Sequence, residues 1–138
     1  MAREEILENI KKVFKEIWEK EEIMAILLYG SQLNEEYITN RSDIDICIVA
    51  PNHRNPEDLY IKAQVAARDP KFDVKIFELL PLYLKVEVIK NHEIIFVRDR
   101  LELYEYFYKF RKIWKDQESR NKITREDALY ILRKKRKS

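Results

Sequence analysis

The first third of the chain carries two hydrophobic patterns in succession. Apolar residues recur every three or four positions over residues 3–20, which predicts an amphipathic helix. A continuous apolar run from Ile23 to Tyr29 follows and predicts a buried central strand. Gly30-Ser31 ends this strand, and a polar connection follows it. Residues 43–49 then alternate between apolar and polar side chains, which predicts a second strand.

The remaining pattern alternates between helix and strand. Its predicted elements are a helix over 56–68, a strand over 72–79, a helix over 81–90, a strand over 93–97, a helix over 101–115 and a last helix that begins at Thr124. In the first of these helices we expect Leu59, Ala63 and either Ala66 or Ala67 to face the core. This order predicts an α/β (α+β) fold, in which helices flank a small mixed β-sheet. We expect a core over residues 1–98 and a helical extension over 99–138 packed on the same domain.

Composition narrows the class of protein. The 138 residues include one Gly, one Cys and two His, 46% of them are apolar, and the formal net charge is +2. These values argue against a disordered chain, a disulfide framework and a zinc finger. No apolar run approaches the ~20 residues needed to cross a bilayer. We therefore expect a cytoplasmic protein without a membrane partner. For the basic tail at 133–137 we favour a solvated helix end over a nucleic-acid contact.

Two acids stand on the strand predicted at 43–49. Alternate side chains of a strand share a face, so Asp43 and Asp45 are neighbours, whereas Ile44 and Ile46 point to the opposite, apolar face. Two carboxylates buried together repel each other, and a divalent cation removes that cost. Oxygen ligands at this spacing suit Mg²⁺, which binds one or two carboxylates together with substrate phosphates. The alternative is a solvated strand face that carries two acids.

A glycine and a serine precede this strand. Gly30 is the one glycine in the chain, and a glycine lets the backbone approach a phosphate closely. The N–H groups that follow it and the Ser31 hydroxyl can bind phosphate oxygens. Gly30 can also serve a tight turn, and Ser31 can cap a helix. We favour phosphate binding because the pair lies between an apolar strand and the Asp-x-Asp strand.

A third acid, Asp73, lies inside the strand predicted at 72–79, where acids are disfavoured. If this strand lies beside the Asp-x-Asp strand, Asp73 joins Asp43 and Asp45. Three carboxylates around one or two Mg²⁺ ions make a site for nucleotidyl transfer. Lys75 shares the face of Asp73, and it either meets a triphosphate or pairs with Asp73.

These residues resemble a known family over about residues 23–98. An apolar strand, Gly30-Ser31, Ser42-Asp43-Ile44-Asp45 and a later Asp73 follow one another as in the minimal nucleotidyltransferases of the DNA polymerase β-like superfamily. The resemblance implies a polymerase β-like sheet, Mg²⁺ as the cofactor and ATP as the nucleotide substrate.

The resemblance also assigns roles to residues. The implied catalytic and metal-binding residues are Asp43, Asp45 and Asp73, of which Asp73 also helps to activate the acceptor. Beside these, we predict Gly30, Ser31, Ser42 and Lys75 as the nucleotide-binding residues.

Small members of this family resemble antitoxins, whose partner is a HEPN-domain ribonuclease toxin. The resemblance implies that this chain transfers AMP from ATP to a tyrosine hydroxyl of such a toxin. Many members continue Gly-Ser with a small residue, Arg and Gly, where this chain has Gln32-Leu33-Asn34-Glu35. This difference motivates a first alternative, a catalytically weak or inactive antitoxin that neutralises its partner by binding. A second alternative is a nucleotidyltransferase for a small molecule or an RNA end.

Aromatic residues are crowded in the helix predicted at 101–115. One core-facing stripe would use Leu101, Tyr104, Phe107 or Tyr108, Phe110 or Arg111, and Trp114. The aromatic residues outnumber this stripe, so we expect some of them to be exposed for a protein partner. We expect Cys47 to be a small core residue, and His53 and His92 to face solvent.

Overall fold

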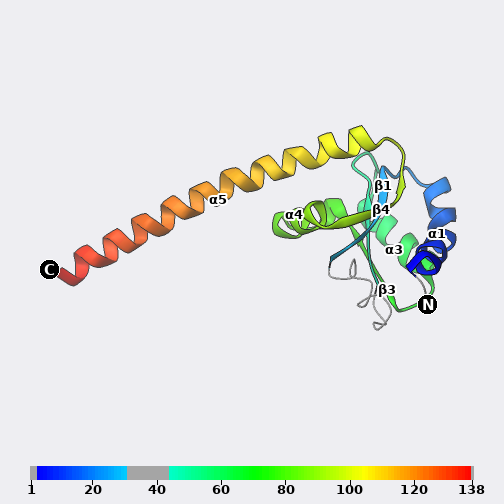
Figure 1. Ribbon diagram of the computed structural model, residues 1–138, viewed down its shortest axis with the longest axis horizontal. Coiled ribbons are helices and arrows are strands. Elements are labelled where there is room, and N and C mark those ends of the chain that lie inside the picture. Colours follow the sequence, from blue (N-terminus) through cyan, green and yellow to red (C-terminus); the bar gives the residue numbers. More distant parts are fainter. Residues whose placement is uncertain (1–2, 31–43, 138) are drawn as a thin grey trace.

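The computed structural model describes residues 3–30 and 44–137 and, within these ranges, the side chains from Glu4 to Ser119 and that of Tyr130. Its elements are α1 (Arg3–Lys20), β1 (Ala25–Tyr29), β2 (Ile44–Val49), α3 (Pro56–Ala67), β3 (Phe72–Ile76), the 3-10 helix η2 (Phe77–Leu79), α4 (Leu82–Lys90), β4 (His92–Val97) and α5 (Arg100–Lys137). The predicted fold class, a mixed sheet flanked by helices, is confirmed (Figure 1).

The four strands form one sheet in the order β3-β2-β1-β4. β1 pairs antiparallel with both β2 and β4, and β2 pairs parallel with β3 through the connection that contains α3. All five residues of β1 are buried, as expected for a central strand covered on both faces.

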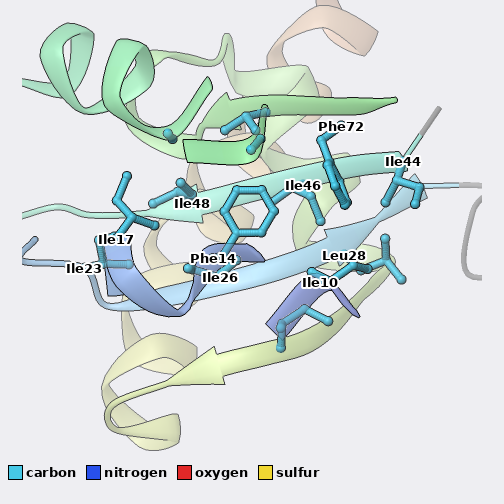
Figure 2. Close-up of a cluster of buried hydrophobic side chains, with 14 of the residues drawn as sticks. Ile10, Phe14, Ile17, Ile23, Ile26, Leu28, Ile44, Ile46, Ile48 and Phe72 are labelled. Atoms are coloured by element: carbon cyan, nitrogen blue, oxygen red, sulfur yellow. The ribbon is translucent and has the colours of Figure 1, made fainter. Parts of the chain in front are cut away.

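Helices α1 and α3 cover one face of the sheet (Figure 2). The Phe14 ring of α1 lies against β1 and β2 and meets the Phe72 ring edge-on, with centroids 5.5 Å apart. α3 contributes Leu59, Ala63 and Ala67, so Ala67 is the buried member of the predicted alternative pair. The spacing of apolar residues therefore predicted this layer correctly.

Helix α4 and the beginning of α5 cover the opposite face (Figure 1). The Phe77 ring lies at its centre, 5.2 Å from the rings of Phe107 and Phe110. Cys47 is buried in the same layer, as predicted. A polar contact joins this layer to the sheet: Glu78 accepts hydrogen bonds from the Ala50 N–H and the Tyr106 hydroxyl, both at 2.8 Å.

The third strand is shorter than predicted. β3 ends at Ile76, and the chain turns through η2, where the N–H of Leu80 donates to the carbonyl of Phe77 at 3.1 Å. The turn lets Glu78 reach the backbone of Ala50 and the Tyr106 hydroxyl. These contacts come from distant parts of the chain, so the local alternation of residues could not reveal them.

The two C-terminal helices predicted at 101–115 and from Thr124 are one continuous helix of 38 residues. Figure 1 shows α5 leaving the sheet and extending far beyond it. Residues 116–123 contain neither Gly nor Pro, so nothing in them ends the helix. None of the helices in the described ranges has the length and apolar character needed to span a membrane.

The core-facing stripe of α5 also differs from the predicted one. Leu103 and Phe107 are buried, while Leu101 and Tyr104, expected in the core, are 67% and 46% exposed. Tyr108 is 64% exposed. The expectation that this helix carries exposed aromatic residues is therefore confirmed, although the stripe is shifted along the sequence.

Both histidines are less exposed than predicted. The His53 side chain is 11% exposed, with its Nε2 3.7 Å from Glu21 Oε1. His92 is partly buried, with its Nδ1 2.9 Å from the carbonyl oxygen of Val88 and its ring 5.5 Å from that of Phe107. His53 lies in the connection between β2 and α3, whereas His92 begins β4 and packs against α4 and α5. Both positions look like loops in the sequence, because the contacts that bury them come from distant residues.

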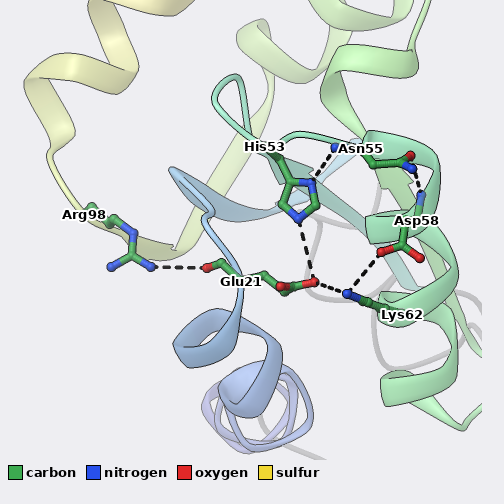
Figure 3. A network of polar contacts seen from close by, with 6 residues as sticks. All are labelled: Glu21, His53, Asn55, Asp58, Lys62 and Arg98. Atoms are coloured by element: carbon green, nitrogen blue, oxygen red, sulfur yellow. Dashed lines mark hydrogen bonds and ion pairs between the residues drawn. The ribbon is translucent and has the colours of Figure 1, made fainter.

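A polar network ties α1, α3 and the end of β4 together (Figure 3). The Glu21 carboxylate is 3.0 Å from Lys62 Nζ, which also lies 3.0 Å from Asp58 Oδ2. Arg98 donates from Nε to the carbonyl of Ile23 at 2.6 Å and stacks over the Trp18 ring. This network lies at the end of the sheet where β2 finishes, away from the acids at its beginning.

Candidate functional site

The parallel pairing of β2 and β3 brings two of the three predicted acids together. Asp45 of β2 is the register partner of Asp73 of β3, so their side chains share a face. Asp45 is partly buried, whereas Asp73 is exposed. The expectation that the Asp73 strand lies beside the Asp-x-Asp strand is confirmed.

The same line continues across the sheet. Continuing the antiparallel register of β1 and β2 by one residue beyond Leu28 and Ile46 places Tyr29 opposite Asp45, and Tyr29 pairs with His92 of β4. Asp73, Asp45, Tyr29 and His92 therefore form one cross-strand row, which we call the acidic row. Burial, with the negative charges of Asp45 and Asp73 as lesser causes, raises the pKa of the Tyr29 phenol. The phenol is therefore neutral at physiological pH.

Gly30 ends β1 beside this row. Its φ is +81°, and an ideal Cβ at this position would lie 3.8 Å from Asp45 Oδ2. Positive φ is the conformation that glycine adopts without steric cost. The backbone therefore passes close to the Asp45 carboxylate as the chain enters the predicted phosphate-binding turn. The tight-turn interpretation of Gly30 holds, and it is compatible with phosphate binding.

Lys75 pairs with Asp73, the second of the alternatives that the sequence left open. Its Nζ lies 3.3 Å from Asp73 Oδ2, and both side chains are more than a third exposed. Cys47, the register partner of Lys75, is fully buried, and burial raises the pKa of its thiol. A neutral, buried thiol matches the predicted core role and not that of a nucleophile.

Three of the predicted site residues, Ser31, Ser42 and Asp43, lie outside the described residues, and their roles stay predictions. Among the residues that the structure describes, no three His, Cys, Asp or Glu side chains form a group able to hold a metal ion. Asp45 and Asp73 offer adjacent carboxylates, and the neighbouring Gly30 has no side chain to fill the space. This donor set fits a hard cation such as Mg²⁺, which commonly takes one or two protein carboxylates.

Sequence reasoning missed two residues at the start of β4, one just before the strand and one that belongs to the acidic row. Asn91 and His92 are separated by about 60 residues from Gly30 and Tyr29, yet they contact or pair with them. No local pattern in the sequence marks this contact, because it depends on the register between β1 and β4.

The model of the family described as polymerase beta, nucleotidyltransferase, matches residues 8–101 of this chain. The chain belongs to this nucleotidyltransferase family. The match covers the sheet, the acidic row, most of α1 and the helices α3 and α4. The family resemblance expected from the Gly-Ser and Asp-x-Asp motifs is thereby confirmed.

Relatives of this polymerase β-type nucleotidyltransferase include MJ1547 of Methanocaldococcus jannaschii, which carries the name protein adenylyltransferase. The two are 50% identical over 113 residues, which span 82% of this chain and 84% of MJ1547.

Solved structures of toxin–antitoxin proteins share the fold of this nucleotidyltransferase. A toxin–antitoxin structure with AMP-PNP matches with a TM-score of 0.64 and 16% identity, covering 89% of this chain and 98% of the other. A complex of a tri-AMPylated HEPN toxin with its MNT antitoxin from Shewanella oneidensis matches with a TM-score of 0.59 and 18% identity, covering 89% and 95%. These structures show that the chain has an MNT antitoxin-like fold. The family match and the relative at 50% identity make it an enzyme of the nucleotidyltransferase class.

Proposed function

We propose that this chain transfers AMP from ATP to a tyrosine hydroxyl of a HEPN-domain toxin and thereby acts as its antitoxin in the cytoplasm. The observation that carries the proposal is the pairing of Asp45 with Asp73 beside Gly30. The 50% identity to a protein named adenylyltransferase supports AMP transfer to a protein. The shared fold with an MNT antitoxin bound to an AMPylated HEPN toxin supports the partner.

The reaction forms one bond and breaks one bond at phosphorus. The acceptor oxygen bonds to the α-phosphorus of ATP, the bond from that phosphorus to the bridging oxygen breaks, and pyrophosphate leaves. The proton of the acceptor hydroxyl would pass to the carboxylate of Asp73, to which we assign the activation of the acceptor. Most of the catalytic effect in such phosphoryl transfers comes from positioning and from stabilisation of charge.

The chain's own residues divide this work. Asp45 and Asp73, together with Asp43, would hold Mg²⁺, and the bound ion would supply positive charge at the triphosphate. We assign the acceptor side to Asp73, because it is more exposed than Asp45 and a protein hydroxyl must reach it from solvent. Lys75, 3.3 Å from Asp73, limits the negative charge that accumulates there. Gly30 and Ser31 would face the triphosphate.

The test follows label from ATP to protein. The chain is mixed with α-labelled ATP, Mg²⁺ and a HEPN-domain protein from the same organism, and the label on that protein is measured. We expect Asp45→Asn and Asp73→Asn each to reduce the rate by about 100-fold or more. Glu57→Gln, which changes an exposed acid on α3, is the control and should leave the rate unchanged. Absence of label with the unmodified chain would overturn the proposal.

A binding antitoxin is the second candidate, and the outer face of α5 favours it. Leu101, Tyr104 and Tyr108 are exposed at helical spacing, and aromatic side chains are frequent anchors of protein interfaces. The double variant Asp43→Asn, Asp45→Asn separates the two candidates. Neutralisation of the toxin at an equal dose supports binding alone, whereas loss of neutralisation with an intact complex supports catalysis. Label on a small molecule or an RNA end without any protein partner would support the remaining alternative.

A further inference from the structure

Asn91 joins the end of α4 to the glycine at the end of β1. Its carbonyl oxygen accepts a hydrogen bond from the Gly30 N–H at 3.2 Å. Its side-chain Nδ2 donates to the Gly30 carbonyl at 3.2 Å. One residue therefore holds both polar backbone groups of Gly30, although 61 positions separate the two in the sequence.

Gly30 needs such a restraint more than other residues do. A glycine has no side chain to limit its backbone and samples positive and negative φ about equally. At +81° its backbone passes beside the Asp45 carboxylate. The Gly30 carbonyl belongs to the peptide group that leads into Ser31, the residue predicted to bind phosphate. A change of conformation at Gly30 would therefore move the predicted turn relative to the acidic row.

Asn91 is itself fixed on two sides. It is the C-terminal cap of α4, where its N–H donates to the carbonyl of Glu87 at 3.1 Å. The next residue, His92, begins β4 and pairs with Tyr29 of the acidic row. The side chain of Asn91 is exposed, so it contributes little to the packing of the core. Its side-chain contact is directed at Gly30.

We infer that Asn91 is a positioning residue of the nucleotide site. It holds Gly30 in the conformation that keeps the Gly30 backbone beside Asp45, and it does so without touching the reacting atoms. The amide is suited to this task because it donates to a carbonyl, whereas a carboxylate has no N–H to donate. This inference rests on the proposed transfer of AMP from ATP, and it adds a residue to that same site.

Because the chain has a single glycine, the restraint that Asn91 places on Gly30 can be measured at one amide signal. Full-length protein labelled with ¹⁵N-glycine gives one backbone amide signal, that of Gly30, because the chain has one glycine. Asn91→Ala removes the side-chain bond to the Gly30 carbonyl and keeps the bond from the Gly30 N–H to the backbone carbonyl of Asn91. Because the lost bond makes local opening at Gly30 easier, we expect this amide to exchange with solvent roughly 3- to 10-fold faster. Asn55→Ala is the matched control. It removes a side-chain bond to the N–H of Asp58 at the other end of the sheet and should leave the Gly30 signal unchanged.

The kinetic measurement separates positioning from general stability. With the protein acceptor of the proposed reaction, Asn91→Ala and Asn91→Asp should lower kcat/KM for ATP by about 10-fold or more. We expect KM for ATP to rise and KM for the protein acceptor to stay constant, because only the nucleotide side of the site is disturbed. Asn55→Ala should leave both KM values unchanged even though it loses a comparable hydrogen bond.

The outcomes of the two measurements are distinguishable. If Gly30 exchange or KM for ATP in Asn91→Ala equals that of the unmodified protein, the positioning role is overturned. Equal increases in both KM values would also overturn it, because they would indicate a general loss of structure. If the unmodified chain transfers no AMP to any acceptor, the proposed function fails, and the inference that depends on it fails with it. The exchange measurement would then still report whether Asn91 restrains Gly30.

Discussion

Two of the described residues, Gly30 and Arg68, hold a positive φ, and the two positions differ in chemistry. Gly30 has φ +81° and Arg68 has φ +58°. Glycine adopts this region freely, whereas a side chain with a Cβ pays a steric cost there. Arg68 is the C-terminal cap of α3, and its N–H donates to the carbonyl of Gln64, a position where glycine is usual. The chain therefore has the optimal residue at its candidate site and a suboptimal one at a helix end.

Replacing Gly30 with alanine and Arg68 with glycine should change the free energy of unfolding in opposite directions. Gly30→Ala should lower the free energy of unfolding by about 1–2 kcal/mol, because alanine is strained at positive φ. The added Cβ itself would make only an ordinary contact at 3.8 Å with Asp45 Oδ2. Arg68→Gly should raise the free energy of unfolding by roughly 0.5–1 kcal/mol. Urea unfolding of both variants measures these changes in the free energy of unfolding. A Gly30→Ala variant as stable as the unmodified protein would contradict the prediction that alanine is strained at this φ.

At the scale of single residues, the sequence predicted correctly those positions that follow from the alternation of side chains along a strand. Asp45 lies on the face opposite Ile44 and Ile46 because of strand periodicity, and Asp73 was marked by being an acid within a strand. Asn91 could not be predicted, since its partner Gly30 is fixed by the pairing of two distant strands. The pairing of Lys75 with Asp73 was one of two alternatives, and the structure shows it at 3.3 Å. Contact of Lys75 with a triphosphate stays a prediction.

At the scale of elements, one buried acid connects α5 to the sheet. Glu78 of η2 bonds to the backbone of Ala50 and to Tyr106 of α5. Burial raises the pKa of the Glu78 carboxyl, although both hydrogen bonds and the charge of Lys85 act in the opposite direction. The folded protein therefore holds a proton on Glu78 more tightly than the unfolded chain does.

The sign of this shift predicts how stability depends on pH. The charged carboxylate opposes folding above the folded-state pKa, and this penalty disappears as the pH falls toward 4.5, the ordinary pKa of a glutamate side chain. Between pH 7 and pH 5, the free energy of unfolding of the native protein should therefore rise relative to that of Glu78→Gln. Urea unfolding at both pH values gives this difference. Glu102→Gln, which changes an exposed acid of α5, should show no such trend, and an equal trend in both variants would contradict the role of Glu78.

The continuity of α5 explains why its prediction failed. Residues 116–122 are polar and lack apolar periodicity, so a pattern-based interpretation breaks the helix there. Helix formation in a polar segment depends on intrinsic propensity instead, and this segment has no strong helix breaker. At 1.5 Å per residue, the 38 residues of α5 extend about 57 Å.

Breaking α5 beyond its last core contact should show whether the distal part of the helix stabilises the core or is held by intrinsic helix propensity alone. Trp114 is the last partly buried residue among the described side chains of α5, and Ser119 is exposed. Ser119→Pro should cost the exposed segment about 3 kcal/mol of helix stability and reduce the far-UV circular dichroism signal. Tm should stay unchanged, because no described core contact is lost. A Tm lowered by several degrees would show that the distal half of α5 stabilises the core.

At the scale of the whole molecule, stability and chemistry occupy opposite ends of the sheet. The acidic row lies where β2 and β3 begin, and the network around Glu21 lies where β2 ends (Figure 3). An active site that gathers like charges reduces stability, so it benefits from a scaffold secured elsewhere. The two hydrophobic layers supply that scaffold, one on each face of the shared sheet (Figures 1 and 2).

Because both layers pack on one sheet, they should unfold together. Phe14 is fully buried in the α1/α3 layer and Phe107 is 2% exposed in the α4/α5 layer. Replacing either with alanine should cost about 3–5 kcal/mol, a large share of the roughly 5–15 kcal/mol typical of a domain. Each variant should still unfold in one cooperative transition followed by fluorescence and circular dichroism in urea. Tyr108→Ala, next to Phe107 but 64% exposed, should change stability by less than about 0.5 kcal/mol. Two separate transitions in Phe107→Ala would mean that α4 and α5 detach while the sheet and the α1/α3 layer remain folded. The sheet face that carries the acidic row would then lose its helical layer before the rest of the protein unfolds.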